Sequence, residues 1–179
     1  MVYIILGTGF EEAEAIIPCD LLRRAGVETR LAGVGGREIT GGHGMTVVAD
    51  CAAEDVDLTE AEMIVLPGGL GGVEAINGAE KVLAAVKEVY ARGDFAAAIC
   101  AAPTVLSRLG LLDGKNATCY PGLEPKLTGA KTAGAAAVRD GKLITGRAAG
   151  TAFDFGLLLV EALCGAETAQ RVKDEVVYR

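Results

Sequence analysis

Cys100 follows a short apolar run and precedes a helix start, which is the arrangement of a nucleophile at a strand-to-helix corner. Phe95 to Ile99 has the length of a buried strand, and the small residues 101–103, with a proline last, suit a tight turn into a helix. At such an elbow the side chain projects from the carboxyl end of a sheet, where free helix N–H groups favour an anion. The pattern predicts a reactive thiolate. The alternative is a buried cysteine that only fills space beside Ala and Ile.

Three carboxylates, Glu11, Glu12 and Glu14, come soon after the first apolar run of the chain. In one interpretation they only favour the positive end of their own helix. In the other, one of them shares a proton with Cys100 and serves as general acid and base while the sulfur attacks a carbonyl. Spacing alone favours the first interpretation.

The glycine-rich stretch Pro67 to Gly72 is either a simple turn or a close approach of the backbone to the elbow. In the second case the N–H groups of Gly69 and Ala101 would together donate to a developing oxyanion. The single histidine, His43, stands in a glycine-rich turn, and we expect it to be a solvated residue far from the elbow.

Other chemistries are disfavoured by the composition and by incomplete motifs. Gly7-Thr-Gly9 begins a dinucleotide fingerprint, but Glu12 replaces its third glycine and would repel a pyrophosphate. A net charge of −7 argues against nucleic acid as a partner, and a single histidine excludes a His-rich metal site. We expect no cofactor and no metal. Five cysteines without a C-x-x-C pair predict reduced thiols.

Strands and helices alternate along the chain, and the strands are continuously apolar, which predicts an α/β fold of three layers around a mostly parallel sheet. Ligands bind beyond the carboxyl ends of the strands in such folds. The expected strands are 2–6, 27–34, 63–66, 95–99 and 117–120, with a hairpin around Asp140-Gly141 and a short strand, 45–49, outside the main sheet. The expected helices are 11–25, 80–91, 152–164 and 166–176, and the apolar stripe of the first comprises Ala13, Ile16, Ile17 and Leu21.

The length of 179 residues suits one domain that covers residues 1–179. No apolar segment is long enough to cross a membrane, and Met1 to Leu6 lacks the basic flank of a signal peptide. We therefore expect a cytoplasmic protein with no membrane partner.

Three segments in this order resemble the ThiJ/PfpI superfamily, in the branch of the Parkinson disease protein and bacterial YajL. They are Glu11-Glu-Ala-Glu14, Leu66-Pro-Gly-Gly69 and Ala98-Ile-Cys-Ala-Ala-Pro103. The resemblance extends through residues 23–26, 150–155 and 160–163, and so covers essentially the whole chain. It implies a flavodoxin-like sandwich, a homodimer, and Cys100 as an oxidation-prone nucleophile.

The same resemblance assigns the partner of the cysteine. The third glutamate of the family's E-E-x-E run contacts the nucleophile, which selects Glu14. A protonated Glu14 that donates to the sulfur would stabilise the thiolate. Arg24 matches a family arginine at the anion-accepting edge of the pocket, with its usual companion replaced by Gly44; a simple helix-surface charge is the alternative.

Two departures from the family pattern bear on the activity. The protease-like PfpI branch has histidine directly after the nucleophile, where this chain has Ala101. The chain therefore lacks the histidine that a peptidase of this branch would use as its base. The Parkinson branch has His-Pro where this chain has Tyr120-Pro121, and Tyr120 is expected to line the substrate pocket. The resemblance thus implies a cofactor-free glyoxalase or deglycase acting on small reactive carbonyl compounds such as methylglyoxal. The alternative is an oxidative-stress sensor or redox chaperone that works through oxidation of Cys100.

Overall fold

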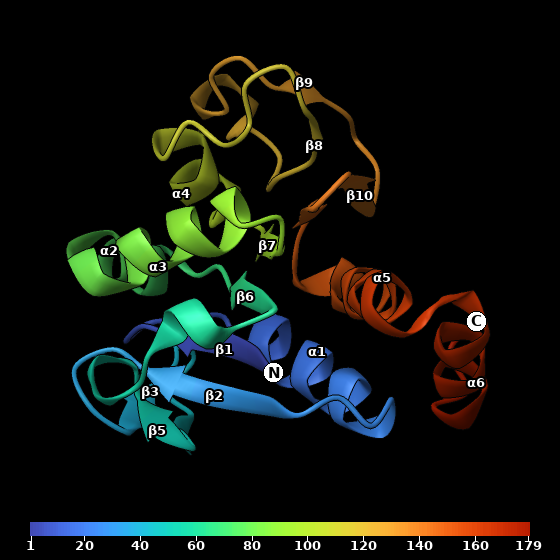
Figure 1. The fold of residues 1–179 in the computed structure, drawn as a ribbon, viewed down its shortest axis with the longest axis horizontal. Helices are drawn as coiled ribbons and strands as arrows, with labels where there is room; N and C mark the ends of the chain where they lie inside the picture. Colours follow the sequence, from blue (N-terminus) through green and yellow to red (C-terminus); the bar gives the residue numbers. More distant parts are fainter.

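The computed structural model describes residues 1–179 and contains a seven-stranded sheet in the order β10-β11-β7-β6-β1-β2-β5 (Figure 1). All neighbouring strands are parallel except β10 and β11, which form the antiparallel hairpin predicted at Asp140-Gly141. The strands of this sheet are β1 (Val2–Leu6), β2 (Thr29–Gly33), β5 (Cys51–Ala52), β6 (Met63–Leu66), β7 (Phe95–Ile99), β10 (Ala137–Asp140) and β11 (Leu143–Gly146). The prediction of a mostly parallel α/β sheet is confirmed.

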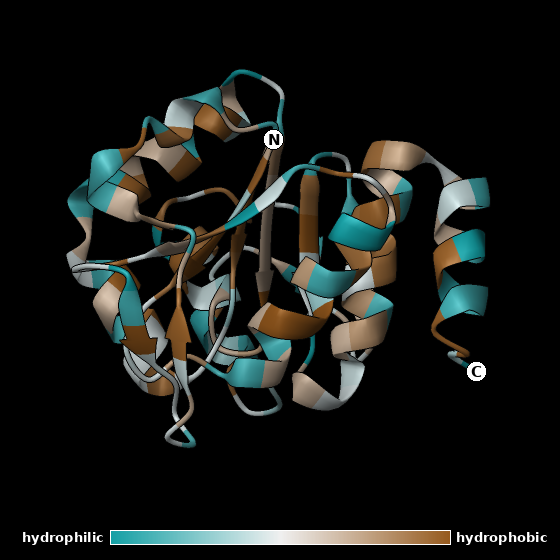
Figure 2. Ribbon diagram, turned by 90° about the horizontal axis from the view of Figure 1, so that it is seen from below, coloured by the Kyte–Doolittle hydropathy of each residue, from teal (hydrophilic) through white to brown (hydrophobic).

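Helices cover both faces of the sheet, which explains why its central strands are apolar throughout. The helices are α1 (Glu12–Arg24), α2 (Leu70–Gly78), α3 (Glu80–Ala91), α4 (Pro103–Arg108), α5 (Ala152–Cys164) and α6 (Ala166–Glu175). One hydrophobic cluster joins α2, α3 and α4 to one face, and a second joins α1, α5 and α6 to the other. Successive residues of a strand enter alternate clusters, as with Ile4 and Ile5. In Figure 2 the central strands are coloured as hydrophobic, whereas α6 is largely hydrophilic.

The order in which strands are added to the sheet reverses between β1 and β6, and this reversal determines where a ligand site can form. From β1 the chain continues to β2 on one side, whereas β6, β7 and β11 follow one another on the other side. Loops at the carboxyl ends of β1, β6 and β7 therefore meet at a topological switch point. These loops carry the glutamate run, the Pro67–Gly69 segment and Cys100.

The predicted apolar stripe of α1 is partly wrong. Ile16 is 41% exposed, whereas Glu14, Ala15, Pro18 and Cys19 are among the buried residues of this helix. The buried face is set by two neighbours at once, because α1 packs on the sheet and also lies along α5. Gly156 of α5 makes the close approach possible: a Cβ there would lie 2.7 Å from the side chain of Leu21.

Two other segments differ from the sequence-based expectation. The strand expected at 117–120 is reduced to β8 (Asn116–Ala117), which pairs with β9 (Lys131–Thr132) outside the main sheet. Thr118 donates its N–H to Oγ1 of Thr145, and Tyr120 donates its N–H to the carbonyl of Cys100, so neither joins a strand ladder. Helix α2 was not predicted, because Pro67 to Gly72 indicated only a turn.

The short strand expected outside the main sheet is confirmed. It is β4 (Thr46–Val48), which pairs antiparallel with β3 (Glu38–Thr40) in a two-stranded sheet. The glycine-rich turn that carries His43 connects these two strands.

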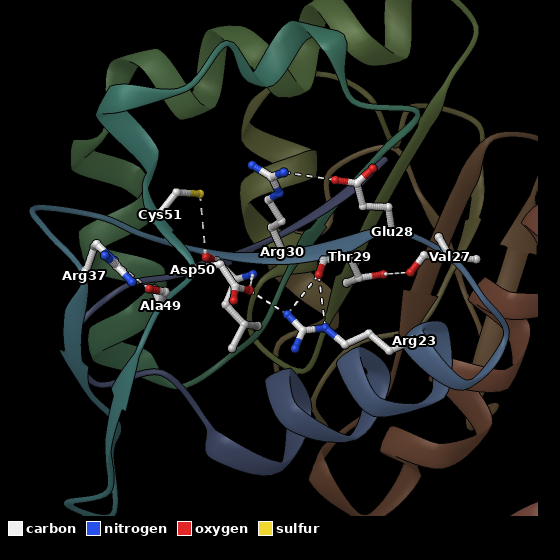
Figure 3. A network of polar contacts seen from close by, with 10 residues as sticks. Arg23, Val27, Glu28, Thr29, Arg30, Arg37, Ala49, Asp50 and Cys51 are labelled. Carbon is white, nitrogen blue, oxygen red and sulfur yellow. Dashed lines mark hydrogen bonds and ion pairs between the residues drawn. The ribbon is translucent and has the colours of Figure 1, made fainter.

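A network of polar contacts fixes the C-terminal end of α1 to β2 and to the segment before β5 (Figure 3). Arg23 donates to the carbonyl of Thr29 and, at 2.6 Å, to the carboxylate of Asp50. The same carboxylate accepts the N–H of Leu31 at 2.8 Å. These contacts join three segments that lie far from the switch point. None of the helices is both long and apolar enough to span a membrane.

Candidate active site

Cys100 adopts a backbone conformation that non-glycine residues rarely occupy. Its φ angle is +66°, while the flanking strand β7 and helix α4 are regular. Its N–H donates to the carbonyl of Gly146 and its carbonyl accepts the N–H of Tyr120, so hydrogen bonds on both sides hold the turn. Strain of this kind persists only where surrounding structure imposes it, and it occurs preferentially at functional sites. The elbow predicted at Cys100 is therefore present.

Glu14 lies in the first turn of α1 and is completely buried. Its Oε2 accepts the N–H of Gly68 at 2.9 Å. The other oxygen, Oε1, is buried without a conventional hydrogen-bond partner, and the carboxyl interacts with the thiol of Cys100. Of the three candidate carboxylates, Glu14 is thus the one that meets the cysteine.

Burial controls the ionisation of this pair. Burial raises the pKa of Glu14 to about 7, against the opposing effects of the Cys100 thiol and the Gly68 N–H. Burial and then the negative charge of Glu14 raise the pKa of Cys100 to about 12. Between these values the two groups hold one proton and one negative charge. The thiolate therefore forms when the proton resides on Glu14, and not through a low pKa of the isolated thiol.

The backbone N–H groups of Gly69 and Ala101 both point at the sulfur of Cys100, and both lower its pKa. They therefore favour negative charge on the sulfur, which is the thiolate form of Cys100. Gly68 has no space for a side chain: a Cβ there would lie 2.5 Å from Glu14 Oε2 and 2.7 Å from the Cβ of Cys100. The three loops are in direct contact at this point.

A pocket of about 460 Å³ opens onto Cys100. Its rim includes Tyr120, which is 50% exposed, and Leu70, which is 80% exposed. The lining residues are Glu11, Gly69, Leu70, Cys100, Ala101, Tyr120, Pro121, Gly122 and Leu123. Tyr120 therefore lines the pocket as expected, and it is positioned by the hydrogen bond between its N–H and the Cys100 carbonyl.

Sequence reasoning missed Glu11, Leu70 and Leu123 as pocket residues. The sequence indicates Glu11 only as a candidate partner of the cysteine, and the glycine-rich stretch 67–72 places Leu70 in a turn. The one available signal was their adjacency to predicted site residues, since Leu70 directly follows Gly69.

Glu12 and His43 form a separate pair beside the site. Glu12 Oε2 lies 2.8 Å from His43 Nδ1, and Glu12 Oε1 accepts the backbone N–H of His43. Although burial acts to raise the pKa of Glu12, hydrogen bonds from His43 lower it to about 2. The imidazole is solvated, as expected, but it is not remote: Nδ1 lies 3.7 Å from Glu11 Oε2.

The placement of Arg24 in the pocket is not supported within this chain. Arg24 lies in the last turn of α1, at the opposite end of the helix from Glu14, and pairs with Asp20 at 2.7 Å. Its side chain is half-exposed, so the alternative of a helix-surface charge describes it. A helix of this length separates its ends by about 18 Å.

The residues that come closest to a metal-binding cluster are Glu11, Glu12 and His43, whose ligand atoms lie within 4.8 Å of one another. The hydrogen bonds between Glu12 and His43 already use two of these three groups. The arrangement is accounted for as an ion pair.

The assembled geometry agrees with comparisons to known proteins. A family model described as the DJ-1/PfpI family matches residues 1–162. The chain belongs to the DJ-1/PfpI family. Its relatives further place it in the DJ-1 branch of that family, the branch of the Parkinson disease protein.

Two relatives of this DJ-1/PfpI member and two solved structures illustrate the similarity. Protein dj-1beta of Drosophila melanogaster is 39% identical over 172 residues, covering 94% of this chain and 92% of that protein. A Pyrococcus abyssi protein named a deglycase is 34% identical over 151 residues, covering 83% and 90%. The crystal structure of Drosophila DJ-1beta gives a TM-score of 0.95 at 37% identity, covering 99% and 97%. Toxoplasma gondii DJ-1, described as oxidized, gives 0.95 at 30% identity, with the same coverage. The flavodoxin-like fold is confirmed.

Proposed function

We propose that this DJ-1/PfpI protein is a cofactor-independent enzyme of the glyoxalase or deglycase type. Its substrates are methylglyoxal-like dicarbonyls or their early adducts with thiols and amines. One observation carries the proposal: the thiol of Cys100, at a strained elbow, faces a buried Glu14 whose pKa is raised to about 7. A relative named a deglycase supports this substrate class.

In the first step the sulfur of Cys100 adds to the aldehyde carbon of methylglyoxal. A C–S bond forms, the carbonyl electron pair moves to oxygen, and that oxygen takes the proton shared by Cys100 and Glu14. The N–H groups of Gly69 and Ala101 stabilise the oxygen while it carries charge. The product of this step is a hemithioacetal.

In the second step Glu14, now a carboxylate, removes the hydrogen from the carbon that bears the sulfur. The electron pair forms an enediolate, Glu14 returns the proton to the neighbouring carbon, and the hydroxyl proton of the first carbon passes to the oxygen of the second. The first carbon is thereby oxidised to a thioester and the second is reduced to an alcohol. Water then cleaves the C–S bond, which releases lactate and restores the thiol. An early adduct enters the same sequence by releasing its thiol or amine.

The test is the disappearance of methylglyoxal and the appearance of lactate with no added glutathione. We expect Cys100→Ser to remove turnover, because no sulfur remains to form the hemithioacetal. Circular dichroism controls for folding of the variant. Full activity in Cys100→Ser would overturn the proposal, and so would a native protein that consumes no dicarbonyl.

A second candidate function is an oxidative-stress sensor or redox chaperone that works through Cys100. The observation in its favour is the unpartnered Glu14 Oε1, which in the protonated carboxyl can donate to an oxidised sulfur. Mass analysis after mild peroxide treatment separates the two functions. Selective oxygen addition at Cys100 in a protein without dicarbonyl turnover supports the sensor.

We also propose that the protein is a homodimer and resides in the cytoplasm. The dimer would cover exposed apolar side chains: Val48 on β4, Met45 beside it, and Ile16 on α1. The Glu12–His43 pair links α1 to the hairpin that contains β4. Sedimentation equilibrium would test the dimer, which Met45→Lys should weaken. All five cysteines are free thiols, which suits a reducing compartment.

A further inference from the structure

The pocket at Cys100 is unusual in its charge. Its lining contains one carboxylate, that of Glu11, and no lysine, arginine or histidine. The remaining lining consists of glycine, alanine, the cysteine, and larger apolar or aromatic groups such as Leu70 and Tyr120. Of the ionisable groups described, Glu14 also faces the sulfur, and it too is acidic. A ligand in this pocket therefore meets the negative charge of Glu11, and no basic side chain of the lining opposes it.

The backbone holds Glu11 firmly at this place. Its N–H donates to the carbonyl of Gly68 at 3.0 Å, and its carbonyl accepts the N–H of Glu14 at 3.1 Å. Glu11 is thereby attached to Glu14 and to Gly68, whose N–H binds the carboxyl of Glu14. After burial, the negative charge of Glu11 makes a smaller contribution to the raised pKa of Glu14.

Only one side chain is placed to compensate this charge. His43 Nδ1 lies 3.7 Å from Glu11 Oε2, but its shorter contact, 2.8 Å, is to Glu12. Glu12 also accepts the backbone N–H of His43 through its other oxygen. Two carboxylates thus share one imidazole, so this group of three residues keeps a net negative charge beside the pocket.

We propose that Glu11 determines the charge specificity of this pocket by admitting neutral and cationic carbonyl compounds and excluding anionic 2-oxo acids. The physical basis is repulsion of a second negative charge in a partly desolvated cleft. The inference rests on the proposed role of Cys100 as the attacking group. It names Glu11 as a residue that selects the substrate without taking part in proton transfer.

The test uses thiol reagents that differ in charge, so it needs no enzymatic turnover. Native protein is treated with 2-(trimethylammonium)ethyl methanethiosulfonate, a cation, or with the 2-sulfonatoethyl reagent, an anion. Each forms a disulfide with Cys100 and releases methanesulfinate, and mass spectrometry of the Cys100 peptide gives the rate. We expect the cation-to-anion rate ratio to exceed that of N-acetylcysteine amide by about tenfold, as a nearby unit charge predicts.

Glu11→Gln should lower this ratio to that of the free thiol. The matched control is Glu74→Gln, which removes the same charge from an exposed position of α2 outside the pocket lining and should leave the ratio within about twofold. Added salt should reduce the ratio of the native protein, and this measurement does not depend on folding of any variant.

The outcomes separate this proposal from the proposed enzyme activity. A ratio in native protein equal to that of the free thiol, or one that Glu11→Gln leaves unchanged, overturns the charge specificity even if methylglyoxal is consumed. A high ratio that Glu11→Gln abolishes supports it even in a protein without dicarbonyl turnover. An equal change of both rates in Glu11→Gln reflects altered thiol ionisation and would also overturn it.

Discussion

Both ends of α1 carry charged side chains that contact neighbouring elements. The two ends differ in whether the polar atoms of these side chains have hydrogen-bond partners. In the first turn, Glu14 is fully buried with one oxygen unpartnered. In the last turn, Arg23 is half-exposed, and it bonds the carbonyl of Thr29 and the carboxylate of Asp50 (Figure 3). The end with the unpartnered Glu14 oxygen faces the thiol of Cys100. The end with the hydrogen-bonded Arg23 connects α1 to β2 and to the segment before β5. The difference indicates which end serves chemistry and which serves stability.

Backbone geometry supports the same distinction. The residue opposite Glu14 is Cys100, with its φ of +66°. At the other end of the helix, Asp50 accepts the N–H of Leu31 and so completes the hydrogen bonding of β2. Strain and an incomplete hydrogen-bond set thus occur together at one end of α1 and are absent from the Arg23 network. Changes at the two ends should have opposite consequences for activity and stability.

The largest expected effect is at the N-terminal end. Glu14→Gln keeps the size of the side chain and its acceptor for Gly68 but cannot transfer a proton. Turnover of methylglyoxal should fall by about 100-fold or more, the usual contribution of a general acid and base. Lactate formation under saturating substrate measures it. Retention of more than a third of native turnover would contradict the role of Glu14.

Stability should depend on pH through the same residue. The folded-state pKa of Glu14 is about 7, above the usual 4.5, so the folded protein binds the proton more tightly than the unfolded chain. The free energy of unfolding should therefore fall as pH rises from about 4.5 through 7, by about 3 kcal/mol at 1.4 kcal/mol per unit. Urea unfolding of native protein and Glu14→Gln at several pH values measures the difference. Parallel curves for the two proteins would refute it.

The C-terminal end should show the converse behaviour. Asp50→Ala leaves the N–H of Leu31 without its acceptor and leaves Arg23 with the carbonyl of Thr29 alone, and should lower the free energy of unfolding by about 1–2 kcal/mol. Turnover at the same temperature should stay near the native value, because this network lies far from Cys100. Urea unfolding and the lactate assay measure the two effects. A tenfold loss of turnover in Asp50→Ala would contradict the assignment of this end of α1 to stability alone.

The smallest expected effect is that of Arg24. Its contact is an exposed pair with Asp20, and such pairs contribute little. Arg24→Ala should change neither the thermal midpoint nor turnover measurably. A clear rise in KM for methylglyoxal would instead place Arg24 at a substrate pocket, through an arrangement that one chain alone does not contain.

The parts of the fold that were predicted correctly depend on local signals. Continuous apolar runs indicate the strands 2–6, 63–66 and 95–99. The Asp140-Gly141 pair indicates a hairpin, because the turn depends on the backbone angles of these two residues alone. Helices 80–91 and 152–164 have unbroken helical sequence, and the structure gives the same bounds. The strand expected at 117–120 has apolar residues, but only Ala117 pairs with another strand, β9. Its N–H groups bond a side chain and the elbow instead.

The candidate site was predictable only in part. The corner at Cys100 follows from residues adjacent in sequence, but the choice of Glu14 over Glu11 and Glu12 came from family resemblance. Spacing could not make that choice, because all three lie within the start of one helix and their directions depend on how the helix packs. The pairing of Glu12 with His43 joins residues 31 positions apart, and no local pattern indicates it.

The sequence by itself determined the alternation of apolar strands and helices, the elbow at Cys100 and the acidic start of α1, because each depends on the chemistry of a few consecutive residues. The tertiary structure decided which carboxylate meets the sulfur, which one faces the pocket and which one binds His43. It also decided that Arg24 points away from the pocket of its own chain. Those outcomes depend on the rotation of α1 about its own axis. The packing of its side chains against both the sheet and α5 sets this rotation.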